Sequence, residues 1–254
     1  MRRILLQVAY DGTDYHGFAL QDNVPTIEGE LNRVISDLEG RQIEVIGASR
    51  TDAGVHAKKN IAVYDSFMNI EPEKVSGALN ARLPDDIRIR GSFGVRDDFH
   101  PRKCSCIKTY VYTIINDRYD IPTRSRYACF VPVPLDAGKM DEGSKALLGE
   151  HDFKSFCSVH TQAESTVRTV TDIGVERREN EIVICVKGTG FLYNMVRIIA
   201  GTLIEVGRGK IQPGEVKEIL DAADRRKAGP TAKPRGLCLE DIRFMDEDHT
   251  GEPI

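Results

Sequence analysis

The sequence lacks several features that define whole classes of protein. Nowhere in its 254 residues does an apolar run approach the roughly 20 residues that a membrane-spanning helix needs. The six cysteines form no CxxC pair and the six histidines show no HxxxH spacing, so neither residue type predicts a metal site. We therefore expect no membrane span, no metal and six reduced thiols, which suits a cytoplasmic protein.

An excess of positive charge is also missing. The formal net charge is −4, which argues mildly against a nucleic-acid partner because phosphate contacts favour cationic surfaces. The charges are unevenly distributed, however, with six basic and two acidic residues between positions 101 and 130. A basic surface can therefore lie on an acidic protein, although composition alone does not distinguish it from ordinary solvated arginines.

Hydrophobic periodicity and turn residues predict the order of elements. In the first hundred residues we expect strands at 3–10, 42–47, 60–67 and 87–95, and helices from Thr26 to Gly40 and from Pro72 to Pro84. This β-α-β-β-α-β order is that of the ferredoxin-like fold. Beyond residue 105 we expect strands at 106–116, 126–132, 167–177, 181–187 and 237–244, and helices at 137–148, at 191–205 and after Pro213.

This pattern predicts an α+β protein. We expect two ferredoxin-like halves, 1–102 and 103–254, packed into one extended, mainly antiparallel sheet with flanking helices and a central basic cleft. No low-complexity linker separates the two halves, and a cleft between packed halves is a common place for a functional site.

The segment 47–57 (GASRTDAGVHA) is the most unusual in the chain, because it presents Arg50, Asp52 and His56 among small residues after a predicted strand. Glycine and alanine allow a backbone to approach a ligand closely, and loops at strand ends often hold catalytic groups. The alternative is a plain turn in which Asp52 bonds to nearby backbone N–H groups. Composition alone favours that alternative.

Two further segments carry candidate residues. Strand alternation places Lys108, Tyr110 and Tyr112 on one face. Such a row of basic and aromatic groups can stack a base and hold phosphate. The alternative is that the two tyrosines are simply half-buried, with their hydroxyls at the surface. Arg197 lies among apolar positions of a predicted helix. If it is buried it needs a charged partner, which a carboxylate across the cleft would supply; otherwise it lies on the exposed stripe of the helix.

The loop 228–237 (AGPTAKPRGL) is rigid, basic and rich in proline and glycine. It either lines a groove or simply connects the last helix to the last strand.

Five ordered blocks together resemble the TruA family of tRNA pseudouridine synthases. They are the stretch from Tyr10 to Phe18 with Gln21, the stretch 49–57, Phe99 to Arg102 with Lys108 and Tyr110, the stretch 190–197, and the stretch 228–232. The resemblance covers nearly the whole chain in family order, and five blocks in order are far more specific than any one of them.

The resemblance implies a function and a set of roles. Members convert uridine to pseudouridine at positions 38–40 in the anticodon stem-loop of tRNA, with no metal or organic cofactor, and typically as homodimers. Asp52 matches the catalytic aspartate, Tyr110 the tyrosine that stacks on the target base, Arg197 the arginine paired with the aspartate, and Arg50 the arginine that helps to expose the base. We add His56 and Lys108, from the same blocks, as expected substrate contacts.

The residue types suit this reaction, because a carboxylate can act as a nucleophile or assist glycosidic cleavage. Whether Asp52 attacks C6 or uracil departs through a glycal-like species stays open at this point. Three rival interpretations also stay open: a non-catalytic RNA-binding module, a metal-dependent hydrolase that uses Asp52 and His56, and the same chemistry on another RNA.

Overall fold

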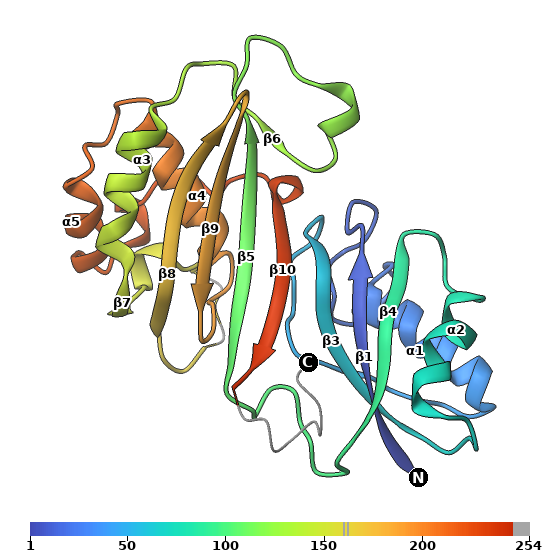
Figure 1. Cartoon of the computed structure of the whole chain (residues 1–254). Helices are drawn as coiled ribbons and strands as arrows, with labels where there is room; N and C mark the ends of the chain where they lie inside the picture. The colour runs from blue at the N-terminus through green and yellow to red at the C-terminus, as the bar shows by residue number, and fades with distance from the viewer. Residues whose placement is uncertain (160, 162, 246–254) are drawn as a thin grey trace. The chain divides into compact units, whose positions relative to one another are not determined.

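The computed structural model describes residues 1–159, 161 and 163–245. Its contacts divide the chain into two compact units, Met1–Cys106 together with the chain from Leu239 onward, and Ile107–Cys238. Figure 1 shows the elements coloured along the chain. The last strand, β10 (Leu237–Phe244), falls mostly into the first unit, whereas the sequence-based boundary at 102/103 leaves it in the second.

Strand pairing and ion pairs connect β10 to β3 of the first unit. Glu240 and Asp241 accept from Lys58 and Lys59 at 2.8 and 2.9 Å. These lysines lie on β3 (His56–Ser66) of the first unit, so the return of the chain to this unit joins residues more than 180 positions apart.

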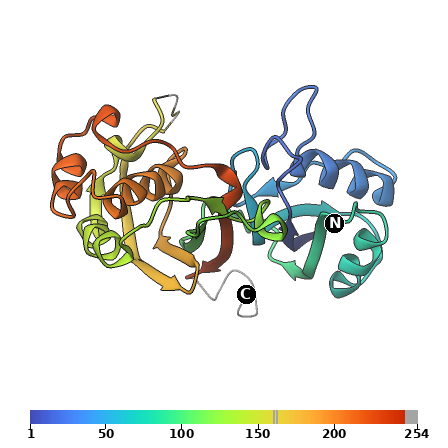
Figure 2. The same ribbon diagram turned by 90° about the horizontal axis from the view of Figure 1, so that it is seen from above.

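The first unit is a mainly antiparallel sheet with two helices. Its strands run in the order β4-β1-β3-β10, and β2 pairs with β3. Figures 1 and 2 show the two helices, which contact each other, beside these strands. The predicted β-α-β-β-α-β order is confirmed as β1 (Arg2–Tyr10), α1 (Ile27–Glu39), β2 (Ile46–Gly47), β3, α2 (Pro72–Asn80) and β4 (Ile87–Val95).

Local signals fix the ends of α1. The Thr26 hydroxyl accepts a hydrogen bond from Gly29 N–H at 3.1 Å, which caps the helix, and Gly40 ends it in the left-handed conformation with φ 67°. The predicted strand at 42–47 is wrong for most of its length. Two backbone N–H groups there, those of Ile43 and Val45, donate to side chains of α1 instead of to a neighbouring strand.

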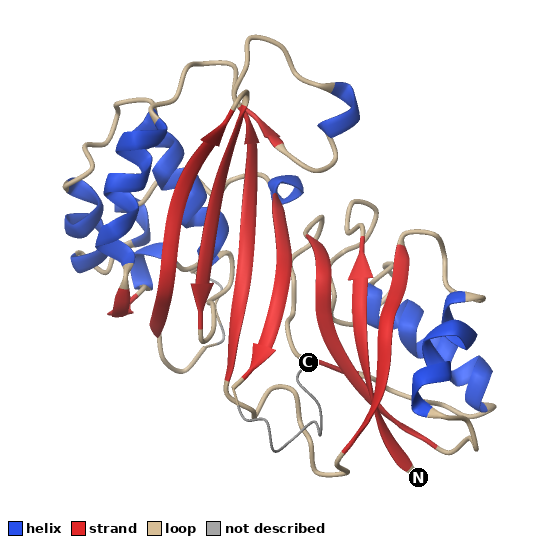
Figure 3. Ribbon diagram, viewed as in Figure 1, coloured by secondary structure: helices blue, strands red, loops and turns tan. Residues whose placement is uncertain are grey.

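The second unit repeats the alternation of strands and helices. Its strands run in the order β5-β9-β8-β7, with antiparallel pairs along this path and β6 parallel to β5. Figure 3 shows the helices gathered beside the strands. The elements are β5 (Cys106–Ile115), β6 (Cys129–Phe130), α3 (Ala137–Ser144), β7 (Gly149–Asp152), β8 (Val167–Arg178), β9 (Glu181–Gly188), α4 (Met195–Gly207) and α5 (Glu215–Asp221).

The helix predicted at 191–205 begins later than expected. Asn194 adopts a left-handed backbone conformation with φ 62° just before α4, and an L-residue in that region cannot continue a right-handed helix. The four residues from 191 therefore stay outside the helix. The strand predicted at 126–132 is reduced to Cys129–Phe130, and β7 was not predicted. The α+β class with a mainly antiparallel sheet is confirmed.

Two findings bear on the expectations from composition. No helix in the described ranges has the length and hydropathy that crossing a bilayer requires. All six cysteines are free thiols, and Cys106, Cys129 and Cys157 are buried.

Candidate active site

The loop 48–55, which joins β2 to β3, carries the candidate nucleophile Asp52. Asp52 is half-buried, and its neighbours Ser49 and Thr51 are buried. The backbone N–H of Val55 donates to the Asp52 carbonyl at 3.1 Å, which closes a tight turn around the carboxylate-bearing residue. The loop thus presents one acidic side chain from a backbone turn that is closed by its own hydrogen bond.

The N-terminal block, residues 10–18, wraps around this loop. Phe18 N–H donates to the Thr51 carbonyl at 3.1 Å, and Gly54 N–H donates to the Tyr15 carbonyl at 3.2 Å. The two segments approach so closely at Gly17 (φ 97°) that a Cβ there would lie 2.7 Å from the Thr51 oxygen. Only glycine fits this position without displacing the Asp52 loop.

A buried polar network holds the loop from the sheet side. The Tyr10 hydroxyl and the Thr51 hydroxyl lie 2.7 Å apart. Asn60 on β3 donates to both the Tyr10 hydroxyl, at 3.2 Å, and the Ser49 carbonyl, at 2.9 Å. Asn60 is fully buried, so these bonds satisfy polar groups that would otherwise be costly to bury.

His56, at the start of β3, is buried with 6% of its surface exposed. Its Nδ1 accepts from Gly12 N–H at 3.2 Å and lies 3.1 Å from Asp11 Oδ1. One nitrogen cannot form both bonds. To accept from Gly12, Nδ1 must carry no proton, whereas to donate to Asp11 it must carry one. We favour the Gly12 bond, since Asp11 Oδ1 already accepts from the Thr13 backbone at 3.0 Å. In this geometry His56 supports the Asp11–Thr13 turn, and its contact with substrate stays a prediction.

Two arginines flank the start of the loop. Arg50 is exposed, and Arg102 donates from Nε to the Gly47 carbonyl at 2.8 Å. Burial, together with the nearby Arg50 cation, lowers the pKa of Arg102. Arg102 belongs to one of the ordered blocks, but the sequence indicated no role for it. Its contact with Gly47 shows that it supports the end of β2, from which the Asp52 loop leaves.

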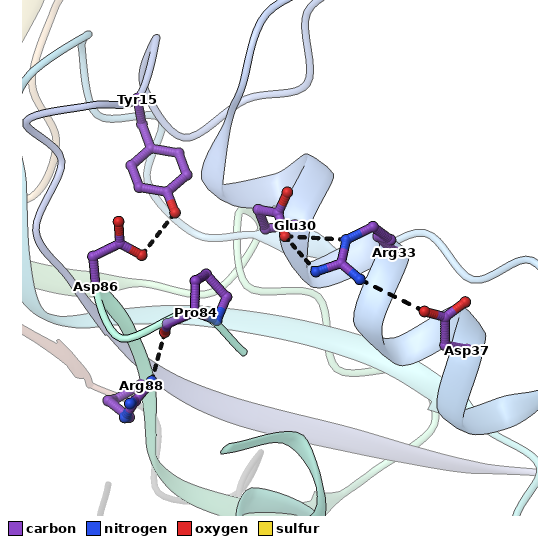
Figure 4. A network of polar contacts seen from close by, with 7 residues as sticks. All are labelled: Tyr15, Glu30, Arg33, Asp37, Pro84, Asp86 and Arg88. Atoms are coloured by element: carbon purple, nitrogen blue, oxygen red, sulfur yellow. Dashed lines mark hydrogen bonds and ion pairs between the residues drawn. The ribbon is translucent and has the colours of Figure 1, made fainter. Parts of the chain in front are cut away.

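The N-terminal block is also anchored away from the loop. The Tyr15 hydroxyl donates to Asp86 Oδ1 at 2.8 Å, just before β4 (Figure 4). Burial, followed by this bond to a carboxylate, raises the pKa of Tyr15. The neutral phenol therefore persists across the ordinary pH range and keeps residues 10–18 attached to the sheet.

In the second unit, Lys108, Tyr110 and Tyr112 lie on β5 at alternate positions, opposite Gly188, Val186 and Ile184 of β9. Tyr110 is 7% exposed and meets the Phe191 ring edge to face, with 5.2 Å between centroids. Tyr112 is fully buried. Its hydroxyl donates to the Lys233 carbonyl at 2.9 Å, so Tyr112 anchors a distant loop and is no part of an exposed row.

Arg197 lies on α4 and is half-buried between buried neighbours. Its Nε donates to the Ala232 carbonyl at 2.9 Å and its Nη1 to Asn194 Oδ1 at 2.7 Å. The expected alternative of a solvated stripe is wrong, because two bonds fix the direction of the guanidinium. Asn194, whose left-handed conformation keeps the preceding residues out of α4, supplies one of these two acceptors through its side-chain oxygen.

The predicted site residues thus form two groups. Asp52, Arg50 and His56 lie on or beside one loop of the first unit, and Lys108, Tyr110 and Arg197 lie in the second unit. Among the described residues, no group of three or more histidine, cysteine, aspartate or glutamate side chains has the arrangement of a metal site. Pairing between the two groups stays a prediction.

Known proteins provide an independent comparison. A family model described as tRNA pseudouridine synthase matches residues 6–102 and 144–245. The tRNA pseudouridine synthase A of Brevibacillus brevis is 45% identical over 244 residues, which is 96% of this chain and 100% of that protein. The protein of the same name from Thermoanaerobacter sp. is 44% identical, over 96% of this chain and 100% of that protein. The one from Shouchella clausii is 39% identical, over 100% of this chain and 95% of that protein.

Among solved structures, a Cbf5-Nop10-Gar1 complex matches 95% of this chain and 60% of that chain with a TM-score of 0.33 and 13% identity, a likeness too low to carry an argument. The family model and the relatives carry the assignment. Asp52, Arg50, His56 and Arg197 all lie inside the stretches that the family model matches, and the relatives extend over Lys108 and Tyr110 as well. This chain belongs to the tRNA pseudouridine synthase family, whose members are isomerases.

Proposed function

We propose that this protein isomerises uridine to pseudouridine at positions 38–40 in the anticodon stem-loop of tRNA, with Asp52 as the nucleophile. The observation that carries the proposal is the construction of the Asp52 loop. The N-terminal block and β3 bond to the backbone of this loop, and Arg102 bonds to Gly47 just before it, so that the backbone bearing the half-buried Asp52 is held in place. Holding a reacting group in a fixed position is a large part of what an enzyme contributes to a rate.

The reaction breaks the bond between N1 of uracil and C1′ of ribose and forms a bond between C5 and C1′. The proton on C5 leaves, and N1 gains a proton, so atoms and electrons balance without an electron carrier or a cofactor. Asp52 starts the sequence either by attacking C6 or by assisting the departure of uracil through a glycal-like species, and it must be ionised to do so. A neighbouring guanidinium favours the ionised form of a carboxylate, which is the role we propose for Arg197.

The remaining residues act on the base. Stacking on Tyr110 holds the detached uracil while it turns, and such stacking contributes about 1–3 kcal/mol per base in other RNA-binding proteins. Extruding a paired uridine costs a few kcal/mol, and exposed Arg50 is suited to filling the space that it leaves. Lys108 and His56 complete the proposed contacts. We further propose that the enzyme acts in the cytoplasm as a homodimer that shares one tRNA.

The Asp52→Asn substitution tests the assignment. It preserves the size of the side chain and removes the nucleophile, so tRNA binding stays close to that of the wild type and turnover is lost. The assay is tritium release from tRNA labelled at uracil C5, with Asp37→Asn, an exposed residue of α1, as the matched control. Tritium release by the Asp52→Asn enzyme would overturn the role of Asp52.

A second measurement tests the positions. Mapping pseudouridine in total RNA from a strain that lacks this protein, with and without the restored gene, identifies the uridines that it modifies. The proposal requires that modification at positions 38–40 is lost and then restored. Loss at any other RNA site alone would leave the chemistry intact but refute the proposed target.

A further inference from the structure

The segment 225–235 (RRKAGPTAKPR), which we call the basic segment, stands out by its charge. It contains five cations and no acidic residue, in a chain whose formal net charge is −4. It begins in a short 3₁₀ helix, Arg225–Lys227, and ends in another, Pro234–Gly236. The sequence left open whether this part of the chain lines a groove or merely connects two elements.

The backbone of the basic segment is held tightly against α4. Gly229 N–H donates to the Thr202 hydroxyl at 3.0 Å. A Cβ on Gly201 would lie 1.7 Å from the Pro230 oxygen, so the segment and the helix are in direct backbone contact. Arg225 braces the segment from within, because its guanidinium donates to the Ala228 carbonyl and to the Thr231 hydroxyl at 3.3 and 3.2 Å.

Three further bonds place the segment in register with the candidate site of the second unit. Ala232 and Arg197 bond reciprocally: Ala232 N–H donates to the Arg197 carbonyl at 3.0 Å, and Arg197 Nε donates to the Ala232 carbonyl at 2.9 Å. The Lys233 carbonyl accepts from the buried Tyr112 hydroxyl. The exposed Lys233 is therefore adjacent in the chain to Ala232, whose carbonyl orients Arg197.

Unlike this anchored backbone, the side chains of Lys227 and Lys233 are open to solvent. Both residues are exposed, and neither side chain lies within ion-pair distance of a carboxylate that the structure describes, although the charge of Lys227 helps to lower the pKa of Asp224. Arg226 is 89% exposed, but it pairs with Asp224 at 2.8 Å. Because the backbone that carries these two ammonium groups is already rigid, it loses little conformational freedom when they bind an anion.

We propose that the basic segment binds the phosphate backbone of the RNA substrate through Lys227 and Lys233, and so sets the register of the RNA relative to Arg197. This inference rests on the proposed function, since it assumes that Arg197 belongs to the active site. Lysine binds phosphate as a point charge without reading the base. The segment therefore contributes affinity and position, whereas the choice of uridine is made elsewhere.

Salt dependence of binding provides the test. Each phosphate that a protein neutralises releases counterions, so the slope of log K against log salt changes by about 0.7–0.9 per contact. The double variant Lys227→Ala/Lys233→Ala should therefore bind unmodified tRNA with a slope shallower by about 1.5. The control Lys139→Ala/Lys217→Ala removes the same charge from exposed positions on α3 and α5 of the same unit and should keep the wild-type slope.

The kinetic readout separates positioning from chemistry. With enzyme in excess of the KM, Lys227→Ala/Lys233→Ala should isomerise bound tRNA more slowly than the wild type, because the RNA is no longer held in register with Arg197, and KM should rise at least tenfold, a change of about 1.4 kcal/mol or more in binding. An unchanged slope, or an equal loss in the control, would overturn the inference. The slope reports binding and does not depend on turnover. If the wild-type protein proves inactive but the lysine variant still shows the shallower slope, only the proposed function is refuted and the binding inference stands.

Discussion

The contact between α4 and the basic segment gives a stability prediction in which two effects oppose each other. Gly201 lies inside α4, where replacing glycine by alanine ordinarily stabilises a protein by about 0.5–1 kcal/mol through helix propensity. A Cβ at this position, however, would lie 1.7 Å from the carbonyl oxygen of Pro230, about half of an ordinary van der Waals contact. Backbone atoms cannot change rotamer, so the segment itself must move.

The size of the effect follows from the bonds that this movement breaks. Three hydrogen bonds join the segment to α4: Gly229 to Thr202, and the reciprocal pair between Ala232 and Arg197. At about 0.5–1.5 kcal/mol each, their loss outweighs the gain in propensity. We expect Gly201→Ala to lower the free energy of unfolding by about 1–3 kcal/mol and to lower turnover, because Arg197 loses the carbonyl that orients it.

Gly77→Ala is the matched control. Gly77 lies inside α2, and a Cβ there would meet nothing within 4 Å. Propensity should therefore act alone and stabilise this variant by about 0.5–1 kcal/mol. Urea denaturation of both variants gives the two free energies from their midpoints and m-values.

The sign of the Gly201→Ala result decides the matter. If Gly201→Ala is as stable as Gly77→Ala, the basic segment is not in backbone contact with α4, and the argument that it sets a register with Arg197 fails. Loss of stability with an intact turnover rate would keep the contact but remove its connection to Arg197.

Two further predictions concern charged groups of the second unit. Arg197→Met removes the donors to Ala232 and Asn194 and should lower both turnover and the free energy of unfolding, the latter by about 1–3 kcal/mol; an enzyme with normal turnover and a normal urea midpoint would exclude a role for this guanidinium. Hydrogen bonding to Arg226 lowers the pKa of Asp224 from 3.8 to about 2, so its contribution to stability is complete above pH 3.8 and is lost as the pH falls through about 2. Carbon-13 NMR should give this midpoint and show it rising toward 3.8 in Arg226→Ala, and a midpoint that does not respond to that substitution contradicts the pairing.

Much of the fold could be predicted because its boundaries are local. The capping hydroxyl of Thr26 and the left-handed Gly40 lie within one turn of the ends of α1, and β4 agrees with the predicted strand at both ends. The segment 42–45 shows where local reading fails. Ile43 and Val45 are buried as their alternation predicts, but alternation reports burial and does not reveal which acceptor each N–H group finds.

The site was predictable to a smaller degree. The Asp52 loop could be recognised by its small residues and its order among the blocks. In contrast, the contacts of Arg102 with Gly47, and of Tyr112 with Lys233, join positions 55 and 121 residues apart. Neither contact leaves a periodic signal in the sequence, and Tyr112 was therefore grouped with an exposed row although it is fully buried.

Three glycines that lie against the ordered blocks share one physical explanation. A Cβ on Gly12 would lie 2.0 Å from the Val55 oxygen, one on Gly17 2.7 Å from the Thr51 oxygen, and one on Gly201 1.7 Å from the Pro230 oxygen. In each case the obstacle is a backbone carbonyl in an ordered block that is distant in the sequence. Of the three, only Gly17 also has a positive φ, so close approach between segments is the common requirement. The blocks therefore carry more than side chains for chemistry: each unit uses glycine to bring a second backbone segment against the one that presents Asp52 or Arg197.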